Sequence, residues 1–252
     1  MTTSSSAERS SVDGEAGTPV RVAAKRLCAD GVVTIELVSA AGTPLPKWTP
    51  GAHVDIEIAD RHVRQYSLCG DPADRTRYRI GVLRETSGRG TSLHIHDHLD
   101  VGDDIVVRGP RNNFPLRPAP HYVFVAGGIG VTPLLPMIRA AAAANADWQL
   151  VYGGRSRASM AFLDELTRHG ERVHVSPQDE TGLLDLAAIV GEPRDDTLIY
   201  CCGPEPLLAA MENACRDWPA QALQLERFSP RPAGALHLRR RSRSCSNRAA
   251  GR

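Results

Sequence analysis

A chain of 252 residues is long enough for two hydrophobic cores, and a hydrophobic content of 42% is typical of a globular protein. No segment approaches the roughly 20 consecutive apolar residues of a membrane-spanning helix, and residues 1–17 lack the apolar core of a signal peptide. The formal net charge of +1 is unevenly distributed: residues 231–252 hold seven arginines and no acid, which leaves −6 on residues 1–230.

The six cysteines are scattered singly, except for the neighbours Cys201 and Cys202. Their adjacency disfavours a disulfide between them. Reduced thiols in a reducing compartment are the simplest interpretation, so we predict a cytoplasmic protein that does not insert into a membrane.

The first half of the chain has the pattern of a β-barrel. Residues 1–17 are rich in Ser, Thr, Gly and Glu, which predicts a disordered tail. From residue 18 to 116, short segments of alternating apolar and polar residues follow one another closely, and Asp30-Gly31 divides the first two as a hairpin turn would. This region predicts a small antiparallel β-barrel with one helix near residues 92–99.

From residue 117 to 228 the pattern changes to an alternation of strands and helices, which predicts a doubly wound parallel α/β sheet. A last apolar run at 222–228 is predicted as its edge strand. Residues 229–252 have no periodic apolar pattern, and we predict disorder there. The remaining strands are predicted at 121–128, 148–154, 172–177 and 197–204, and the helices at 132–144, 159–170, 183–190 and 206–218.

The tetrapeptide 64–67 has the chemistry of a flavin site. Residues two apart on a strand share a face, so Arg64 and Tyr66 can both face a cofactor while Ser67 lies at the end of the strand. An arginine suits the phosphate, a tyrosine suits the wall beside the ring, and a serine suits the N5 atom. Taken alone, the tetrapeptide is more often an ordinary amphipathic strand.

A second sequence suited to a phosphate precedes the predicted short helix. Gly90 lets the backbone approach an anion, and Thr91 and Ser92 lie where free helix amides attract one. Such a loop is more often only a capped turn. Beside Arg64, it becomes a second wall for a flavin phosphate.

The turn at residues 127–133 follows a strand and opens a helix, the place where a doubly wound sheet binds dinucleotide pyrophosphate. Its candidate binding residues are Gly128, Gly130 and Thr132. Pro133 occupies the third glycine position of the G-x-G-x-x-G fingerprint, so the pattern does not favour an ordinary NAD dehydrogenase. A tight turn without a ligand is the alternative.

The segment Cys202-Gly203-Pro204 ends a later strand at the same edge of the predicted sheet, where it can close over a nicotinamide. The alternative is that the thiols are small core residues.

Three histidines, His94, His96 and His98, raise the question of a metal site. On a helix these positions are splayed around the axis, and no cluster of cysteines or carboxylates accompanies them. We therefore predict no metal site.

Seven sequence segments, taken together and in order, resemble the ferredoxin-NADP⁺ reductase-type flavoproteins. More narrowly, they resemble the group of phthalate dioxygenase reductase and the reductase of vanillate O-demethylase. The similarity runs from about residue 20 to residue 228. The segments are RQYSLCGDP, GRGTS, PRNNFPL, VAGGIGVTPLLPM, YGGRSR, YCCGPEPLL and ERF.

The resemblance implies a flavin barrel, a pyridine-nucleotide domain and an oxidoreductase that passes electrons singly to a Rieske oxygenase system. It implies that Ser67, Cys202 and Glu226 are catalytic. It implies FMN rather than FAD, and NADH rather than NADPH, although two arginines could also bind a 2′-phosphate. For the flavin, the implied binding residues are Arg64, Tyr66 and Ser67, with Gly90, Thr91 and Ser92 for its phosphate and Phe228 with Glu226 nearby. For the nicotinamide side they are Gly128, Gly130, Thr132, Cys202, Gly203 and Pro204. For the adenosine ribose they are Arg155 and Arg157.

The chain departs from the group after residue 228. A plant-type iron–sulfur domain needs C-x₄-C-x₂-C and a fourth cysteine, and this region contains only Cys245. We therefore expect no 2Fe-2S cluster in the chain, and a separate ferredoxin or Rieske-type oxygenase component as its electron acceptor.

Two interpretations of residues 229–252 stay open. One is an out-of-frame reading, which would leave a truncated, diaphorase-like fragment without a physiological electron outlet. The other is a natural two-domain reductase whose basic tail seeks an acidic partner. As a different class of function we keep a protein that binds a partner or a nucleic acid through its arginines, although we expect no nucleic-acid partner.

Overall fold

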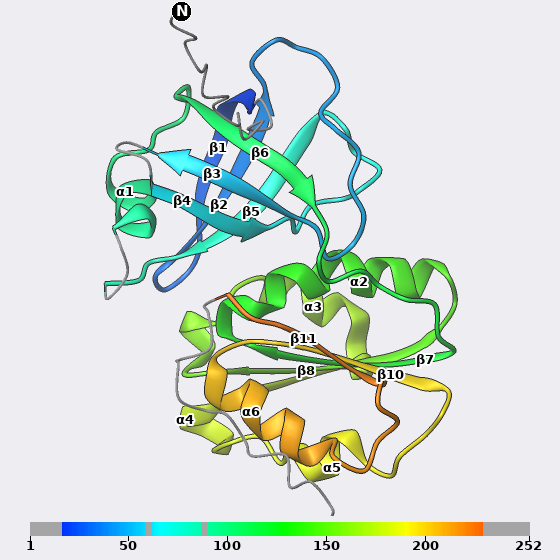
Figure 1. Ribbon diagram of the computed structural model, residues 1–252. Coiled ribbons are helices and arrows are strands. Elements are labelled where there is room, and N and C mark those ends of the chain that lie inside the picture. The colour runs from blue at the N-terminus through cyan, green and yellow to red at the C-terminus, as the bar shows by residue number, and fades with distance from the viewer. Residues whose placement is uncertain (1–16, 59–61, 87–89, 229–252) are drawn as a thin grey trace, which may run out of the picture.

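A computed structural model describes residues 17–58, 62–86 and 90–228. The tails predicted at 1–17 and 229–252 lie outside these ranges, apart from Gly17. Figure 1 shows two bodies stacked on one another, a β-barrel and an α/β layer structure. None of the described helices is long and apolar enough to cross a membrane.

The first body is an antiparallel barrel with the strand order β4-β3-β6-β1-β2-β5. A bridge between Leu68, just after β4, and Ile80 on β5 joins the two outer strands and closes the barrel. The hairpin predicted at Asp30-Gly31 is confirmed, because it joins β1 to β2. The elements are β1 (Thr18–Ala29), β2 (Val32–Ser39), β3 (His53–Ile58), β4 (His62–Ser67), β5 (Arg77–Leu83), α1 (Thr91–Asp97) and β6 (Asp104–Arg111).

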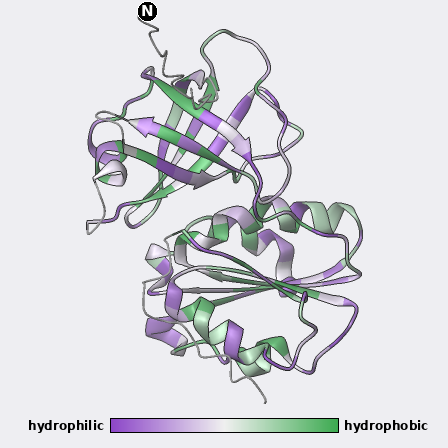
Figure 2. Cartoon of the chain, viewed as in Figure 1, coloured by the Kyte–Doolittle hydropathy of each residue, from purple (hydrophilic) through white to green (hydrophobic). Residues whose placement is uncertain are grey.

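The barrel strands bury every second side chain, as their sequence pattern predicts. Val20 and Val22 on β1, and Ile35 and Leu37 on β2, are at most 1% exposed and face a common core. Figure 2 shows the resulting alternation of hydrophobic and hydrophilic colours along these strands. The antiparallel barrel is therefore confirmed.

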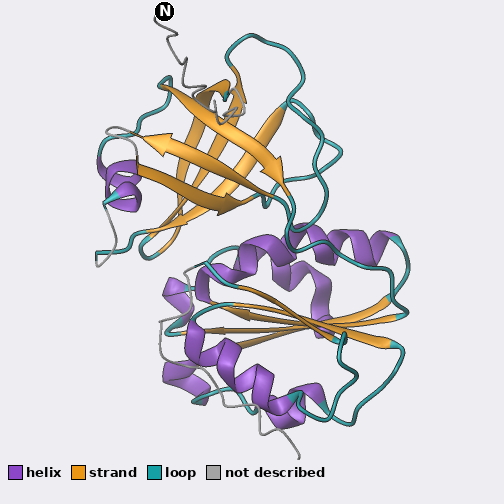
Figure 3. Cartoon of the chain, in the orientation of Figure 1, coloured by secondary structure: helices purple, strands orange, loops and turns teal. Residues whose placement is uncertain are grey.

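The second body is a parallel sheet with the order β11-β10-β7-β8-β9, in which β11 is an edge strand as predicted. Helices cover both of its faces (Figure 3), so the doubly wound α/β class is confirmed. The strands are β7 (His121–Gly127), β8 (Asp147–Gly154), β9 (Val173–Pro177), β10 (Thr197–Cys202) and β11 (Leu223–Glu226). The helices are η1 (Gly128–Gly130), α2 (Val131–Ala143), η2 (Arg157–Ser159), α3 (Leu163–Leu166), η3 (Thr167–Arg172), α4 (Gln178–Thr181), α5 (Leu186–Val190) and α6 (Glu205–Ala214).

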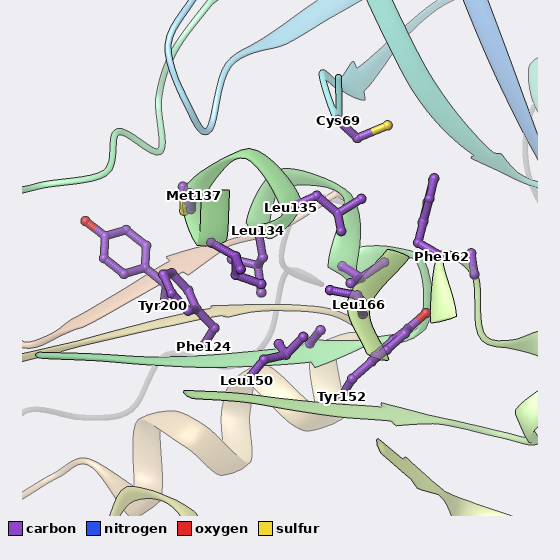
Figure 4. Packing of buried hydrophobic residues seen from close by; sticks show 14 of the residues in the cluster. Cys69, Phe124, Leu134, Leu135, Met137, Leu150, Tyr152, Phe162, Leu166 and Tyr200 are labelled. Carbon is purple, nitrogen blue, oxygen red and sulfur yellow. The ribbon is translucent and has the colours of Figure 1, made fainter. Parts of the chain in front are cut away.

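Helix α2 lies between the sheet and the barrel and is buried around most of its circumference. Figure 4 shows Cys69 of the barrel on one side of this helix and Phe124 and Leu150 of the sheet on the other. A helix that is apolar on all sides is expected to be enclosed. The run from residue 131 to 138 therefore joins the two bodies through one continuous core.

The structure differs from the sequence prediction at residues 159–170, where we expected one helix. The chain instead forms three short pieces, because Phe162 adopts a left-handed conformation with φ 64°. The Phe162 amide donates a hydrogen bond to the sulfur of Cys28 in the barrel, 3.3 Å away. A tertiary contact with the barrel thus overrides the local helical pattern.

Candidate functional site

The candidate site lies where the connections of the parallel sheet change direction. Strands β7 and β10 are neighbours, but the chain leaves β7 toward β8 and reaches β10 only after β9. Ligands of doubly wound sheets bind at such a switch point, outside the carboxyl ends of the strands. The turn after β7 and the segment Cys202-Gly203-Pro204 after β10 both lie there.

These two turns press their backbones together. A Cβ atom on Gly130 would lie 2.2 Å from the carbonyl oxygen of Cys202, and one on Gly203 would lie 3.0 Å from the Cα atom of Gly127. Gly128 differs, because it has φ +53° and faces open space. The glycines at 130 and 203 are therefore needed for contact between the turns, whereas Gly128 leaves room for a ligand.

Pro204 follows this contact and adopts an extended conformation as the N-cap of α6. Its position next to Gly127 fixes the start of that helix, because a Cβ atom on Gly127 would lie 2.7 Å from the Pro204 ring.

Three side chains meet between the barrel and this edge of the sheet. Ser67, at the end of β4, is 5% exposed, and its hydroxyl lies close enough to the carboxyl group of Glu226, at the end of β11, to lower the pKa of that group. The Cys202 sulfur, at the end of β10, lies 4.0 Å from the same carboxyl group. The structure thus brings together the three residues expected to be catalytic.

The electrostatics of this cluster favour neutral forms. Burial raises the pKa of Glu226 from 4.5 to about 7, and the neighbouring Ser67 hydroxyl only partly opposes that rise. Burial, followed by the nearby Glu226, raises the pKa of Cys202 well above its ordinary value. Glu226 can therefore exchange a proton near neutral pH, while Cys202 stays a thiol.

The barrel side of the site offers a cation and an aromatic ring. Arg64 and Tyr66 lie on the same face of β4, and both are partly buried. The Tyr66 ring packs on the barrel core, and burial raises its pKa to about 12, which keeps the phenol neutral. Arg64 makes no ion pair within residues 17–58, 62–86 and 90–228, so its charge is available to an anion.

Helix α1 packs beside β4 and supplies a second part of the barrel site. The Thr91 hydroxyl is buried without a hydrogen-bond partner, and Gly90 caps the helix without a side-chain hydrogen bond. An unpartnered hydroxyl on α1 and an unpaired arginine on the neighbouring strand β4 together fit a phosphate group. The Ser92 hydroxyl, in contrast to that of Thr91, is already hydrogen-bonded. It accepts a hydrogen bond from the Glu85 amide at 3.1 Å, which links the start of α1 to Glu85.

Thr132 contacts the barrel rather than open space. Its hydroxyl donates to the Ile129 carbonyl at 2.9 Å, and it is 2% exposed. A Cβ atom on Gly81 of β5 would lie 2.9 Å from its methyl carbon. The small residue at 81 thus allows the first turn of α2 to dock on the barrel.

The two predicted ribose arginines differ in their surroundings. Both follow β8 and are exposed. Arg157 forms a two-pronged ion pair with Glu180 of α4, with nitrogen–oxygen distances of 3.2 and 2.8 Å. Arg155 makes no such pair with any other described residue. Phe228, at the end of the described chain, is 47% exposed.

The histidines of α1 are less widely splayed than expected. The rings of His94 and His98 lie 5.2 Å apart on one side of the helix, because residues four apart share a face. The His96 ring points to the barrel instead, with a nitrogen 3.0 Å from the Val82 carbonyl.

Sequence reasoning missed a charged cluster at the boundary between the two bodies, which consists of Arg79, Arg139 and Glu165. No motif contains these residues. Only Arg139 stands out in sequence, as a charge within an otherwise apolar helix, and that signal does not say which charges it meets.

The barrel carries an unpaired arginine suited to a phosphate, and it faces a sheet with a glycine turn at its switch point. These features define a flavoprotein of the pyridine-nucleotide-dependent oxidoreductase class. Residues 124–213 match the oxidoreductase NAD-binding domain family. The phenoxybenzoate dioxygenase subunit beta of Ectopseudomonas oleovorans is 43% identical over 233 residues, covering 89% of this chain and 73% of that protein.

The vanillate O-demethylase oxidoreductase of Pseudomonas putida is 36% identical over 211 residues, covering 81% of this chain and 66% of that protein. The solved structure of phthalate dioxygenase reductase matches with a TM-score of 0.79 at 33% identity, covering 83% of this chain and 67% of that one. The chain belongs to this family of oxygenase reductases. It spans roughly two thirds to three quarters of the length of these relatives.

Proposed function

We propose that the protein takes a hydride from NADH onto FMN and passes electrons singly to an iron–sulfur acceptor of an aromatic-ring Rieske oxygenase or demethylase. Flavin supplies the chemistry that converts a two-electron donor into single electrons. In this proposal residues 18–116 are the flavin-binding barrel and residues 117–228 are the nicotinamide-binding domain.

The observation that carries the proposal is the meeting of Ser67, Cys202 and Glu226 between the two bodies. Ser67 is the preorganised donor on the barrel side. Cys202 lines the nicotinamide side of the site as an uncharged thiol, and Glu226 holds or releases a proton near neutral pH. A polar group fixed before the reaction needs no reorganisation during it, which is why such a cluster suits hydride transfer.

Arg64 and the unpartnered Thr91 hydroxyl support a flavin phosphate. The preference for FMN over FAD rests on the resemblance to the phthalate dioxygenase reductase group. The preference for NADH rests on the resemblance, and the pairing of Arg157 with Glu180 supports it, because it leaves only one of the two arginines, Arg155, unpaired within the described residues. We propose that NADPH and FAD are poorer ligands.

For the acceptor we propose a separate ferredoxin or a Rieske-type oxygenase component. The related phthalate dioxygenase reductase has a modular structure and transfers electrons from pyridine nucleotides to a 2Fe-2S centre. Within the described ranges of this chain, no group of three or more histidine, cysteine or acidic side chains could hold a metal ion.

Absorbance spectroscopy, cofactor release and iron analysis of the purified protein test the proposal. The purified protein should show the absorbance of oxidised flavin, lose it on anaerobic addition of NADH, and release FMN on heating. It should reduce ferricyanide readily and contain essentially no iron. A colourless protein, a flavin that NADH does not bleach, or FAD as the main released species would each contradict a stated part of the proposal.

A further inference from the structure

Three charged side chains from separate elements form one cluster between the barrel and the α/β body. Glu165 of α3 accepts hydrogen bonds from Arg79 of β5 at 2.9 Å and from Arg139 of α2 at 2.8 Å. The three side chains are only 24 to 34% exposed. Salt screens such partly buried pairs less than exposed ones.

Both arginines also bind the chain immediately after the barrel strand β4. Arg79 and Arg139 each donate to the Cys69 carbonyl at 2.7 Å, and Arg139 donates as well to the Gly70 carbonyl. One carbonyl oxygen has two lone pairs, so it can accept from both guanidinium groups. The carboxylate of Glu165 joins the two arginines on their other side.

The segment held in this way begins two residues after Ser67. Backbone hydrogen bonds fix it to the barrel, from the Leu68 amide to the Ala52 carbonyl and from the Cys69 amide to the Arg79 carbonyl, each at 2.8 Å. Arg139 fixes it to the other body. The end of β4 is therefore tied to both bodies at the point where Ser67 meets Glu226.

Apolar contacts show that this is a docked interface. The Arg79 guanidinium lies 5.3 Å from the centre of the Phe162 ring, which also packs against Gly81. Cys69 and Phe162 belong to the same buried cluster as α2 (Figure 4). The charged cluster thus fixes the direction of a contact that apolar packing alone would leave less specific.

We propose that Arg79, Glu165 and Arg139 are positioning residues that set the place of Ser67 relative to the nicotinamide side of the site. This inference rests on the proposed function. Glu165 is the central member: without its charge, two guanidinium groups face each other in a partly buried space. The repulsion pushes α2 and the barrel apart, and the end of β4 with Ser67 becomes less well fixed.

The test compares Glu165→Gln with Glu36→Gln in the full chain. Glu36 is a matched control, because it also bridges two arginines, Arg26 at 3.0 Å and Arg77 at 2.8 Å, but lies wholly within the barrel. We expect Glu165→Gln to slow flavin reduction at saturating NADH by about 10- to 10²-fold, the scale of a small misplacement of reacting groups. The FMN content should remain unchanged, and Glu36→Gln should keep the wild-type rate.

A second readout needs no bound cofactor. Amide hydrogen exchange at Leu68 and Cys69 should be faster in Glu165→Gln than in the wild type, and unchanged in Glu36→Gln. Arg139→Gln should reproduce both effects. The double variant with Glu165→Gln should be no slower than either single variant, because residues that act as one unit give non-additive losses.

The outcomes separate this inference from the proposed function. If the wild-type protein binds no flavin or is not reduced by NADH, the proposed function is wrong. If the wild type is reduced but Glu165→Gln matches Glu36→Gln in rate and in exchange at 68–69, the positioning role is wrong. Equal slowing by both variants would indicate a general loss of stability and would also overturn the inference.

Discussion

Ser67 and Glu226 come from different bodies of the molecule, and the Ser67 hydroxyl lies close enough to the Glu226 carboxyl group to lower its pKa. One lies at the end of barrel strand β4, and the other at the end of the last strand of the parallel sheet. The candidate reaction site therefore exists only when the two bodies are docked.

Replacing Ser67 with Ala should slow flavin reduction by NADH by about 10²-fold, the scale of losing one preorganised polar contact. FMN should be retained, because Arg64 is intact. Ser39→Ala, an exposed hydroxyl of the same barrel, is the control. An unchanged stopped-flow rate in Ser67→Ala would show that this hydroxyl takes no part in the reaction.

Glu226→Gln should change how stability depends on pH. Below pH 4.5 the Glu226 carboxyl is protonated in both the folded and the unfolded protein. Its folded pKa is about 7, so between pH 4.5 and 7 only the unfolded chain releases the proton, and the wild type loses up to about 3 kcal/mol. The neutral amide avoids this loss.

Urea unfolding of the flavin-free proteins checks this expectation. The variant should gain stability relative to the wild type at pH 8, and little or none at pH 4.5. A difference that does not depend on pH would contradict the raised pKa.

Arg64→Ala should weaken FMN binding by about 10- to 10²-fold, because a charge-assisted hydrogen bond contributes roughly 1.5–3 kcal/mol. The Arg64→Ala protein should still fold, since Arg64 has no ion-pair partner among the described residues. Arg21→Ala removes a similar charge that is paired with Asp104 elsewhere on the barrel, and should leave the affinity unchanged. Fluorescence titration of the apoprotein with FMN measures both.

Gly130→Ala should destabilise the protein by about 1–3 kcal/mol or more, because the added methyl group meets a backbone oxygen that cannot move freely. Gly128→Ala meets no atom, but its positive φ costs about 1 kcal/mol. Chemical denaturation should therefore give a lower free energy of unfolding for Gly130→Ala than for Gly128→Ala. The reverse order would show that the contact between the two turns is not as close as described.

Glu180→Gln should shift the coenzyme preference toward NADPH, because it frees Arg157 for a 2′-phosphate. Because this ion pair is exposed and screened by solvent, the ratio of kcat/KM for the two nucleotides should change by no more than about fivefold. Asp217→Asn, at another exposed pair, should change nothing. A ratio that stays constant in Glu180→Gln would remove Arg157 from the adenosine site.

Local sequence patterns were sufficient to predict the fold class and most of the elements, but not the three short pieces that replace the helix expected at 159–170. Period-two alternation marked the barrel strands, the strand–helix alternation marked the parallel sheet, and Asp30-Gly31 marked the hairpin. These features are encoded within a few neighbouring residues, because they depend on local backbone geometry and on which side chains face a core.

The contacts between distant residues depend instead on the folded chain as a whole. Folding placed Ser67 against Glu226, joined Arg79 to Arg139 through Glu165, and broke the expected helix at Phe162. Such contacts depend on strand order and on how α2 docks against the barrel. No short stretch of sequence contains that information, because surfaces from elements far apart in the chain must pack together before the charges can pair.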